Sequence, residues 1–121
     1  MFVPRIRVRR PSLESLSPPN EDDVARLAEL REMGSRLELP HPVRAFVLFE
    51  TEARARQASD LLGREGFRCT VRAAQDGAWL VTAVTRLVPT PGSITRLREQ
   101  VESICSAHDG TYRGWDAPVI Y

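Results

Sequence analysis

Few residues in this 121-residue sequence have the types and spacing that catalysis or metal binding requires. The two histidines, His41 and His108, have no partner residue at a spacing that suggests a catalytic triad or a metal site. The two cysteines, Cys69 and Cys105, are far apart and form no CxxC pair, which argues against zinc. The sequence also contains no glycine-rich phosphate loop and no nucleophile elbow. We therefore expect no metal, no cofactor and no enzymatic activity.

Arginine is the residue type with the clearest binding chemistry, since all seventeen basic side chains are arginine. Arg68 and Arg72 alternate with apolar residues in a predicted strand, so they lie on one face of it. Arg44 and Arg86 share that face if the neighbouring strands are in phase. Such a cluster suits phosphate or carboxylate, which gives an alternative function as an RNA- or anion-binding module. Residues 79–84 lack the aromatic motif of RNA-binding sheets, so direct nucleic-acid binding is not the favoured interpretation.

The most distinctive stretch runs from Gly110 to Asp116 and reads Gly-Thr-Tyr-Arg-Gly-Trp-Asp. Its tyrosine and tryptophan flank a glycine in a predicted edge strand. Two interpretations are open: the aromatic side chains anchor a partner protein, or Trp115 covers the core and Gly114 forms a bulge. The predicted partner-binding residues are Tyr112, Arg113, Gly114, Trp115, Asp116, Arg68 and Arg72.

Three helices are predicted from their caps and their apolar periodicity. Asn20 begins the first, with Val24, Leu27, Ala28 and Met33 as its apolar positions and Gly34 as its end. The second runs from Thr51 to Gly66, and the third runs from about Ser93 to His108.

Four strands are predicted over residues 43–49, 67–72, 79–87 and 111–121. The first and third are the most apolar, the second alternates, and the last contains Pro118, which favours an edge. This pattern predicts an α+β fold, a ferredoxin-like split βαββαβ sandwich with a four-stranded sheet and an extra N-terminal helix. The first and third strands lie in the middle of this sheet. The open face of the sheet is one place for the N-terminal helix to pack.

The composition is that of one ordinary globular domain, with 42% hydrophobic residues, 27% charged residues and a net charge of +1. Residues 1–19 are rich in arginine and proline and are expected to form a flexible basic arm, and residues 20–121 a single domain. No segment is apolar for long enough to span a membrane, and the first residues do not read as a signal peptide. We therefore expect a cytoplasmic protein in which both cysteines are free thiols.

The stretch from Gly110 to Asp116 is similar to the Gly-x-Tyr-Asp-Gly-Trp signature of the RraB family of ribonuclease E inhibitors. The resemblance extends over about residues 41–118. It includes the alanine-rich helix from Thr51 to Leu62, the Gly66-Phe67 pair that opens a strand, and Trp79 in the next strand. It implies a small α+β regulator that is not an enzyme, binds ribonuclease E and lowers its cleavage of RNA. The expected partner is therefore a ribonuclease or a degradosome-like protein.

The sequence departs from the family in two ways. Arg113 stands where the signature has aspartate, and the sequence given reaches Tyr121 without an acidic tail. An acidic inhibitor can engage an arginine-rich scaffold by charge, and we expect this protein not to bind a partner in that way.

Overall fold

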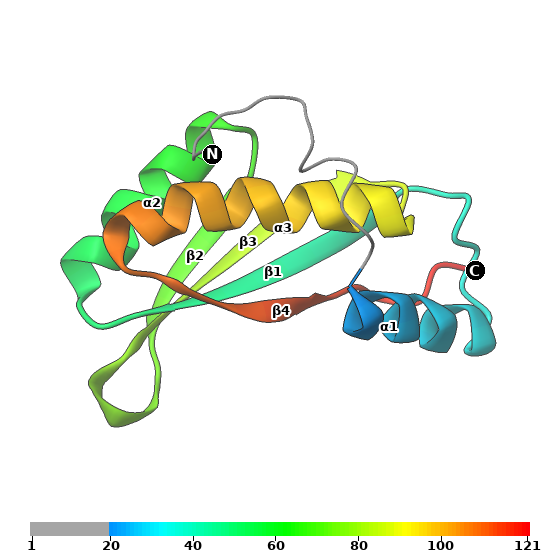
Figure 1. Ribbon diagram of the computed structural model, residues 1–121, viewed down its shortest axis with the longest axis horizontal. Coiled ribbons are helices and arrows are strands. Elements are labelled where there is room, and N and C mark those ends of the chain that lie inside the picture. The colour runs from blue at the N-terminus through cyan, green and yellow to red at the C-terminus, as the bar shows by residue number, and fades with distance from the viewer. Residues whose placement is uncertain (1–19) are drawn as a thin grey trace.

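The structure of the chain, a computed structural model, describes residues 20–121, so the predicted arm over residues 1–19 lies outside the described part. An α+β fold is present, as predicted, and Figure 1 shows its arrangement. The α-helices are α1 (Glu21–Glu32), α2 (Glu52–Arg64) and α3 (Pro91–Cys105). The strands are β1 (His41–Phe49), β2 (Arg68–Ala73), β3 (Trp79–Leu87) and β4 (Thr111–Asp116).

The four strands form one antiparallel sheet in the order β2-β3-β1-β4. The two most apolar strands, β1 and β3, therefore occupy the centre, as their composition predicted. Alternate residues of β1, namely Val43, Ala45 and Val47, are fully buried because α2 and α3 cover the face to which they point (Figure 1). The residues between them point to the opposite face, which no described helix covers.

The helices begin at the capping residues that the sequence suggested. The Asn20 side chain accepts a 2.8 Å hydrogen bond from the backbone N–H of Asp22, and Thr51 caps α2 in the same manner. Helix α3 begins two residues earlier than predicted, because Thr90 and Ser93 form a reciprocal capping box around Pro91. A short 3₁₀ turn follows α3 at Ser106–His108.

Helix α1 does not lie across the open face of the sheet. It packs against α3 and beside the end of β4, as Figure 1 shows. Its buried side chains are Asp23, Leu27 and Leu30, which share one helical face at four- and three-residue spacing. Val24 and Met33, two of the apolar positions named from the sequence, turn away from the core and are 45% and 56% exposed. The apolar periodicity missed this orientation because one position of the buried face is an aspartate.

Strand β4 ends at Asp116 and does not continue to Tyr121. Proline has no N–H for a strand ladder, and Pro118 lies just beyond this end. The segment after the strand turns back to the loop that follows α1. There the N–H of Arg36 donates to the carbonyl of Ile120 at 2.7 Å, and the N–H of Ile120 donates to the Ser35 hydroxyl at 2.9 Å.

Candidate functional site

Glycine is needed at two positions of the distinctive stretch, at Gly110 because there is no space for a side chain and at Gly114 because of its backbone conformation. A Cβ at Gly110 would lie 2.6 Å from the Phe49 ring and 2.9 Å from the Val47 side chain, both of which are buried. Gly114 has a φ of +114°, a backbone conformation that residues with a side chain rarely adopt. It stands beside a bulge, because Gly114 pairs with Phe46 whereas Val47 pairs with Tyr112, so that Arg113 has no partner on β1. The predicted bulge is therefore present, and it turns Arg113 outward as an exposed side chain.

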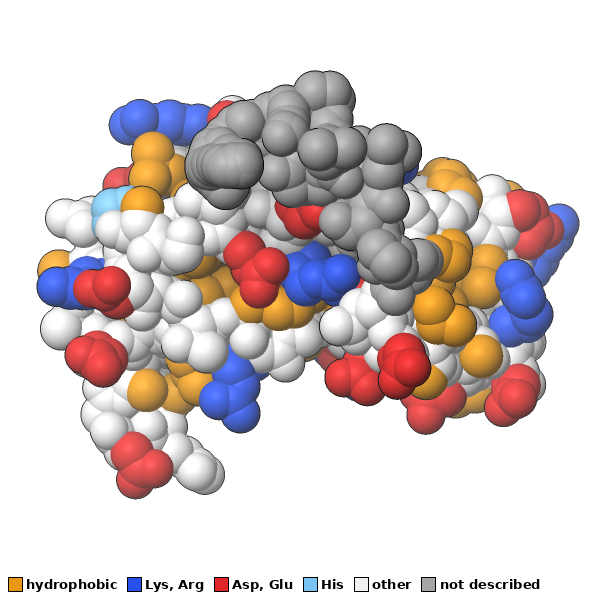
Figure 2. Space-filling model, in the orientation of Figure 1, with side chains coloured by type: hydrophobic (Ala, Val, Ile, Leu, Met, Phe, Trp, Pro, Cys, Tyr) orange, Lys and Arg blue, Asp and Glu red, His pale blue; other side chains and the backbone are white. Residues whose placement is uncertain are grey.

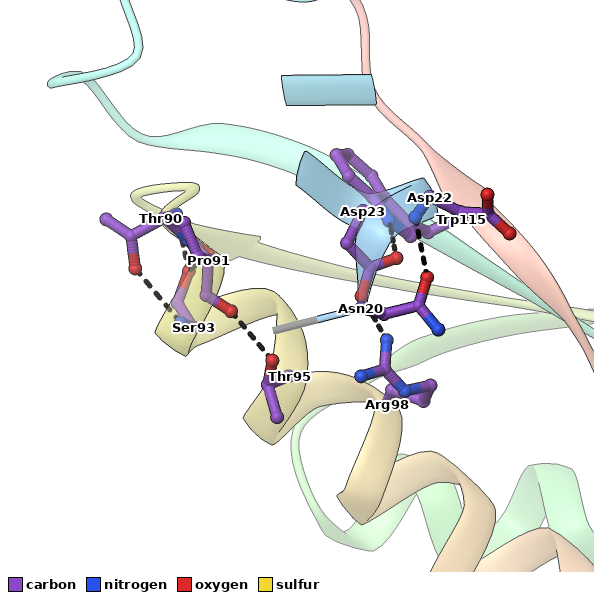
Figure 3. A network of polar contacts seen from close by, with 9 residues as sticks. All are labelled: Asn20, Asp22, Asp23, Thr90, Pro91, Ser93, Thr95, Arg98 and Trp115. Carbon is purple, nitrogen blue, oxygen red and sulfur yellow. Dashed lines mark hydrogen bonds and ion pairs between the residues drawn. The ribbon is translucent and has the colours of Figure 1, made fainter. Parts of the chain in front are cut away.

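Trp115 belongs to the core and is not a surface anchor. It is 3% exposed, and its indole N–H donates a 2.9 Å hydrogen bond to Asp23, which is itself 5% exposed (Figure 3). The same carboxylate forms an ion pair with Arg98 of α3. The guanidinium of Arg26 lies 5.9 Å from the centroid of the Trp115 ring. The network ties α1 to both α3 and β4, and it leaves almost none of the indole exposed.

Tyr112 is also largely enclosed. Its hydroxyl is buried, and residues 20–121 supply no hydrogen-bond partner for it. Burial and the nearby negative charge of Asp23 raise the pKa of this phenol. Tyr112 therefore contributes to the packing between β4 and its surroundings, and little of it remains for a partner.

The exposed part of the stretch lies along a groove between α1 and β4, which we name the β4 groove. It has a volume of about 520 Å³. Its charged lining residues are Asp22, Asp23, Arg26, Glu29, Arg113 and Asp116, and its aromatic lining residues are Phe46 and Trp115. Figure 2 shows that acidic side chains gather over α1, at the lower right of the view. The groove thus offers charges of both signs.

The predicted arginine cluster is present on the open face of the sheet. Arg68 pairs with Val84, which pairs with Arg44, and the pairings of Arg72 and Arg86 have the same phase. We call this surface the arginine face. It comprises Arg44, Arg68, Arg72 and Arg86 around half-buried Phe46, Leu48, Leu80 and Val84.

Only one arginine of this face has an ion-pair partner among the described residues. Arg44 donates two hydrogen bonds of 2.7 Å to the two carboxylate oxygens of Asp116, and this contact raises the pKa of its guanidinium. The structure records no such pair for Arg68, Arg72 or Arg86 within residues 20–121.

The predicted site residues therefore fall at two edges of one sheet. Arg68 and Arg72 lie on β2, and the stretch that ends at Asp116 lies on β4, three strand spacings or about 14 Å away. Phe46 connects the two regions, because it belongs to the arginine face and also lines the β4 groove. A single partner could contact both regions across the open sheet.

Sequence reasoning missed a buried contact between Ser35 and His41. The Ser35 hydroxyl lies 2.6 Å from His41 Nε2, and His41 Nδ1 donates to the Leu39 carbonyl at 2.7 Å. Both side chains are buried, and the serine oxygen already accepts the N–H of Ile120. The contact resembles a nucleophile and base, but it is closed to substrate and instead fastens the C-terminal segment. Its signal in the sequence was only the six-residue spacing.

The remaining side chains that could react or bind a metal are buried or do not cluster into a site. Burial raises the pKa of the Cys105 thiol to about 12, and burial also raises that of Cys69, so neither is a reactive thiolate. Within residues 20–121, no group of three or more histidine, cysteine or acidic side chains is placed to hold a metal ion. In the same part of the chain, no helix has the length and apolar character needed to cross a membrane.

Comparison with known proteins assigns the fold and the distinctive stretch to one family. No curated protein matches the chain. The family model described as RraB, regulator of ribonuclease activity B, matches residues 20–117. The match begins at the cap of α1, so it includes the helix that carries Asp23, and it ends one residue beyond β4. Because this match spans most of the sequence, the chain belongs to the RraB family of regulators of ribonuclease activity.

Proposed function

We propose that this protein is a regulator without catalytic activity that binds a ribonuclease, or a protein of a degradosome-like assembly, and lowers RNA cleavage. The observation that carries the proposal is the family match over residues 20–117. It agrees with a structure in which the signature stretch builds the fold and leaves binding surfaces beside it. The enclosed Ser35–His41 contact supports a binding role over a hydrolytic one.

A binding regulator acts by stoichiometry, and this property can be measured. The tagged full-length protein would first be used to capture partners from its source cells, and any ribonuclease found would then be purified. Titration of that enzyme with the protein should lower the rate of RNA cleavage until a fixed molar ratio is reached. The protein alone should cleave no RNA. An absence of ribonucleases among the captured proteins, or a cleavage rate unchanged at saturating protein, would count against the proposal.

Direct RNA binding is a second candidate, and one observation favours it. The register places four arginines on a single face, and such a face can contact phosphates. In this case the protein would protect RNA from cleavage by any ribonuclease, since the substrate and not the enzyme is bound. Comparison of the partner ribonuclease with an unrelated one on the same RNA separates the two candidates. Protection against both enzymes supports RNA binding, and protection against one supports enzyme binding.

A further inference from the structure

We propose that the arginine face is the docking surface for an acidic segment of a partner protein, one in which carboxylates alternate with apolar side chains. The identity of that partner as a ribonuclease rests on the proposed function above. The chemistry of the docking segment rests on the charges and packing of the face itself.

The arginine face has a strong excess of positive charge. Arg68, Arg72 and Arg86 are exposed and have no ion-pair partner among the described residues. Asp116 is the carboxylate in register with this face, and both of its oxygens are engaged by Arg44. Guanidinium groups bind carboxylates through paired, charge-assisted hydrogen bonds. The face is therefore complementary to a segment that brings its own carboxylates.

Protection of a sheet edge does not account for this arrangement. Charged residues on edge strands prevent pairing between sheets, and this explanation covers Arg68 and Arg72 on β2. Arg44 lies on the central strand β1, where it pairs with Val84 of β3 on one side and with Asp116 of β4 on the other, so it has no edge to protect. An arginine at this inner position, together with Arg86 near the end of β3, indicates that the face as a whole, and not only its β2 edge, is cationic.

The surface between the arginines, which we call the floor of the face, is apolar and contains two hollows. Arg68 and Arg86 flank a hollow of about 260 Å³ whose apolar lining comes from Pro42 and Val84. A second hollow, of about 390 Å³, lies on the other side of the same two residues, next to Arg44. Leu48 and Leu80 continue the apolar surface toward Arg72. Apolar side chains of a partner would pack on this floor while its carboxylates reach the rim.

The floor favours a protein segment over RNA. Proteins that bind single-stranded RNA on a sheet stack bases on several aromatic side chains. The arginine face has one aromatic residue, Phe46, and the Arg44 guanidinium lies 5.5 Å from the centroid of its ring. Its other central side chains are aliphatic residues and threonines, which pack well against leucine or valine and offer no platform for a base.

The first test compares probes of different chemistry. Fluorescence anisotropy would be measured with short labelled probes of equal length. They are a peptide of alternating glutamate and leucine, a peptide of glutamate and serine, a peptide of arginine and leucine, and a single-stranded RNA. We expect the first to bind most tightly, the second to bind more weakly by about tenfold, and the third not to bind. Tighter binding of RNA than of every acidic peptide, or no binding of the glutamate–leucine peptide at low salt, would overturn the inference.

The second test uses two variants with the same change in net charge. In Arg68→Glu/Arg86→Glu both arginines of one hollow are reversed, and in Arg64→Glu/Arg96→Glu two exposed arginines on α2 and α3 are reversed. The first variant should bind the glutamate–leucine peptide at least about tenfold more weakly, whereas the second should bind like the natural protein. Thermal melting confirms that both remain folded. Equal losses in the two variants would show a general charge effect and would overturn the inference.

The two proposals fail in different ways. If both variants capture and inhibit the ribonuclease equally well, the proposed function stands and the arginine face is not its docking surface. If the natural protein binds the acidic peptide but no ribonuclease is captured, the docking inference stands and the proposed function fails. Amide chemical shifts recorded during peptide titration give a third readout. They should change around Arg68, Val84 and Phe46 and remain constant along α1.

Discussion

The indole N–H of Trp115 donates to the carboxylate of Asp23, a residue 92 positions earlier in the chain. This contact joins the last strand to the first helix, and Arg98 of α3 holds the same carboxylate. One acidic side chain therefore fixes three elements relative to one another. Its removal should uncouple α1 from the rest of the fold.

The variant Asp23→Ala should destabilise the protein by about 3 kcal/mol, because it leaves Arg98 without its partner and the indole N–H without its acceptor. Urea denaturation followed by fluorescence measures this loss. Asp22→Ala is the matched control, since Asp22 is an exposed acidic residue in the same turn, and its cost should be below about 0.5 kcal/mol. Similar midpoints for the two variants would contradict the role of the network.

Trp115→Phe separates the hydrogen bond from the packing of the ring. Phenylalanine fills most of the same core site but cannot donate, so Asp23 loses one of its two partners. We expect a loss of about 1–2 kcal/mol, compared with about 3–5 kcal/mol for Trp115→Ala. A Trp115→Ala variant that melts like the natural protein would restore this side chain as a candidate surface anchor.

Gly110→Ala should destabilise the fold although the added group is only a methyl. The new carbon would lie 2.6 Å from the ring of Phe49, whose surroundings are fully packed, and overpacking of this kind costs about 1–3 kcal/mol. Gly63→Ala is the control, because Gly63 lies in α2 and the added carbon would meet no atom within 4 Å apart from its chain neighbours and the backbone of its own helix. That variant should be more stable by about 0.5–1 kcal/mol. Opposite signs for the two changes are the expected outcome.

Ser35→Ala should loosen the C-terminal segment. It removes the acceptor of the Ile120 N–H and the partner of His41 Nε2, and it costs about 1–3 kcal/mol because both groups are largely buried. Hydrogen exchange should accelerate most at the Ile120 amide and less in the central strand β1. Exchange that accelerates equally throughout the chain would indicate a global effect and would contradict this local role.

The sequence predicted the sheet well because its signals were local. Residues 79–87 form a largely apolar run, and β3 has the predicted bounds. The caps at Asn20 and Thr51 depend on neighbouring residues, so they could also be identified. The open-face arginines were found for the same reason, since the two-residue period of strands decides which side chains share a face.

The role of the distinctive stretch could not be predicted in the same way. The sequence is compatible with Trp115 either as a partner anchor or as part of the core until α1 is placed, and the placement of α1 depends on a contact across 92 residues. The burial of Asp23 could not be predicted from its type and position, because an acidic residue in the first turn of a helix is common on electrostatic grounds alone. The only available signal was its four-residue spacing from Leu27, on the face that the structure buries.

Burial of Cys105 raises the pKa of its thiol from 9.0 to about 12. Between these values the unfolded chain loses a proton that the folded protein retains, so the free energy of unfolding should fall as the pH rises from about 9 toward 12. At pH 8 almost no thiolate is present in the folded protein. Iodoacetamide should therefore modify Cys105 only at the rate of unfolding, and half-buried Cys69 should react first. Mass spectrometry of the alkylated peptides measures both rates, and rapid labelling of Cys105 in the folded protein would show that α3 opens far more often than its packing implies.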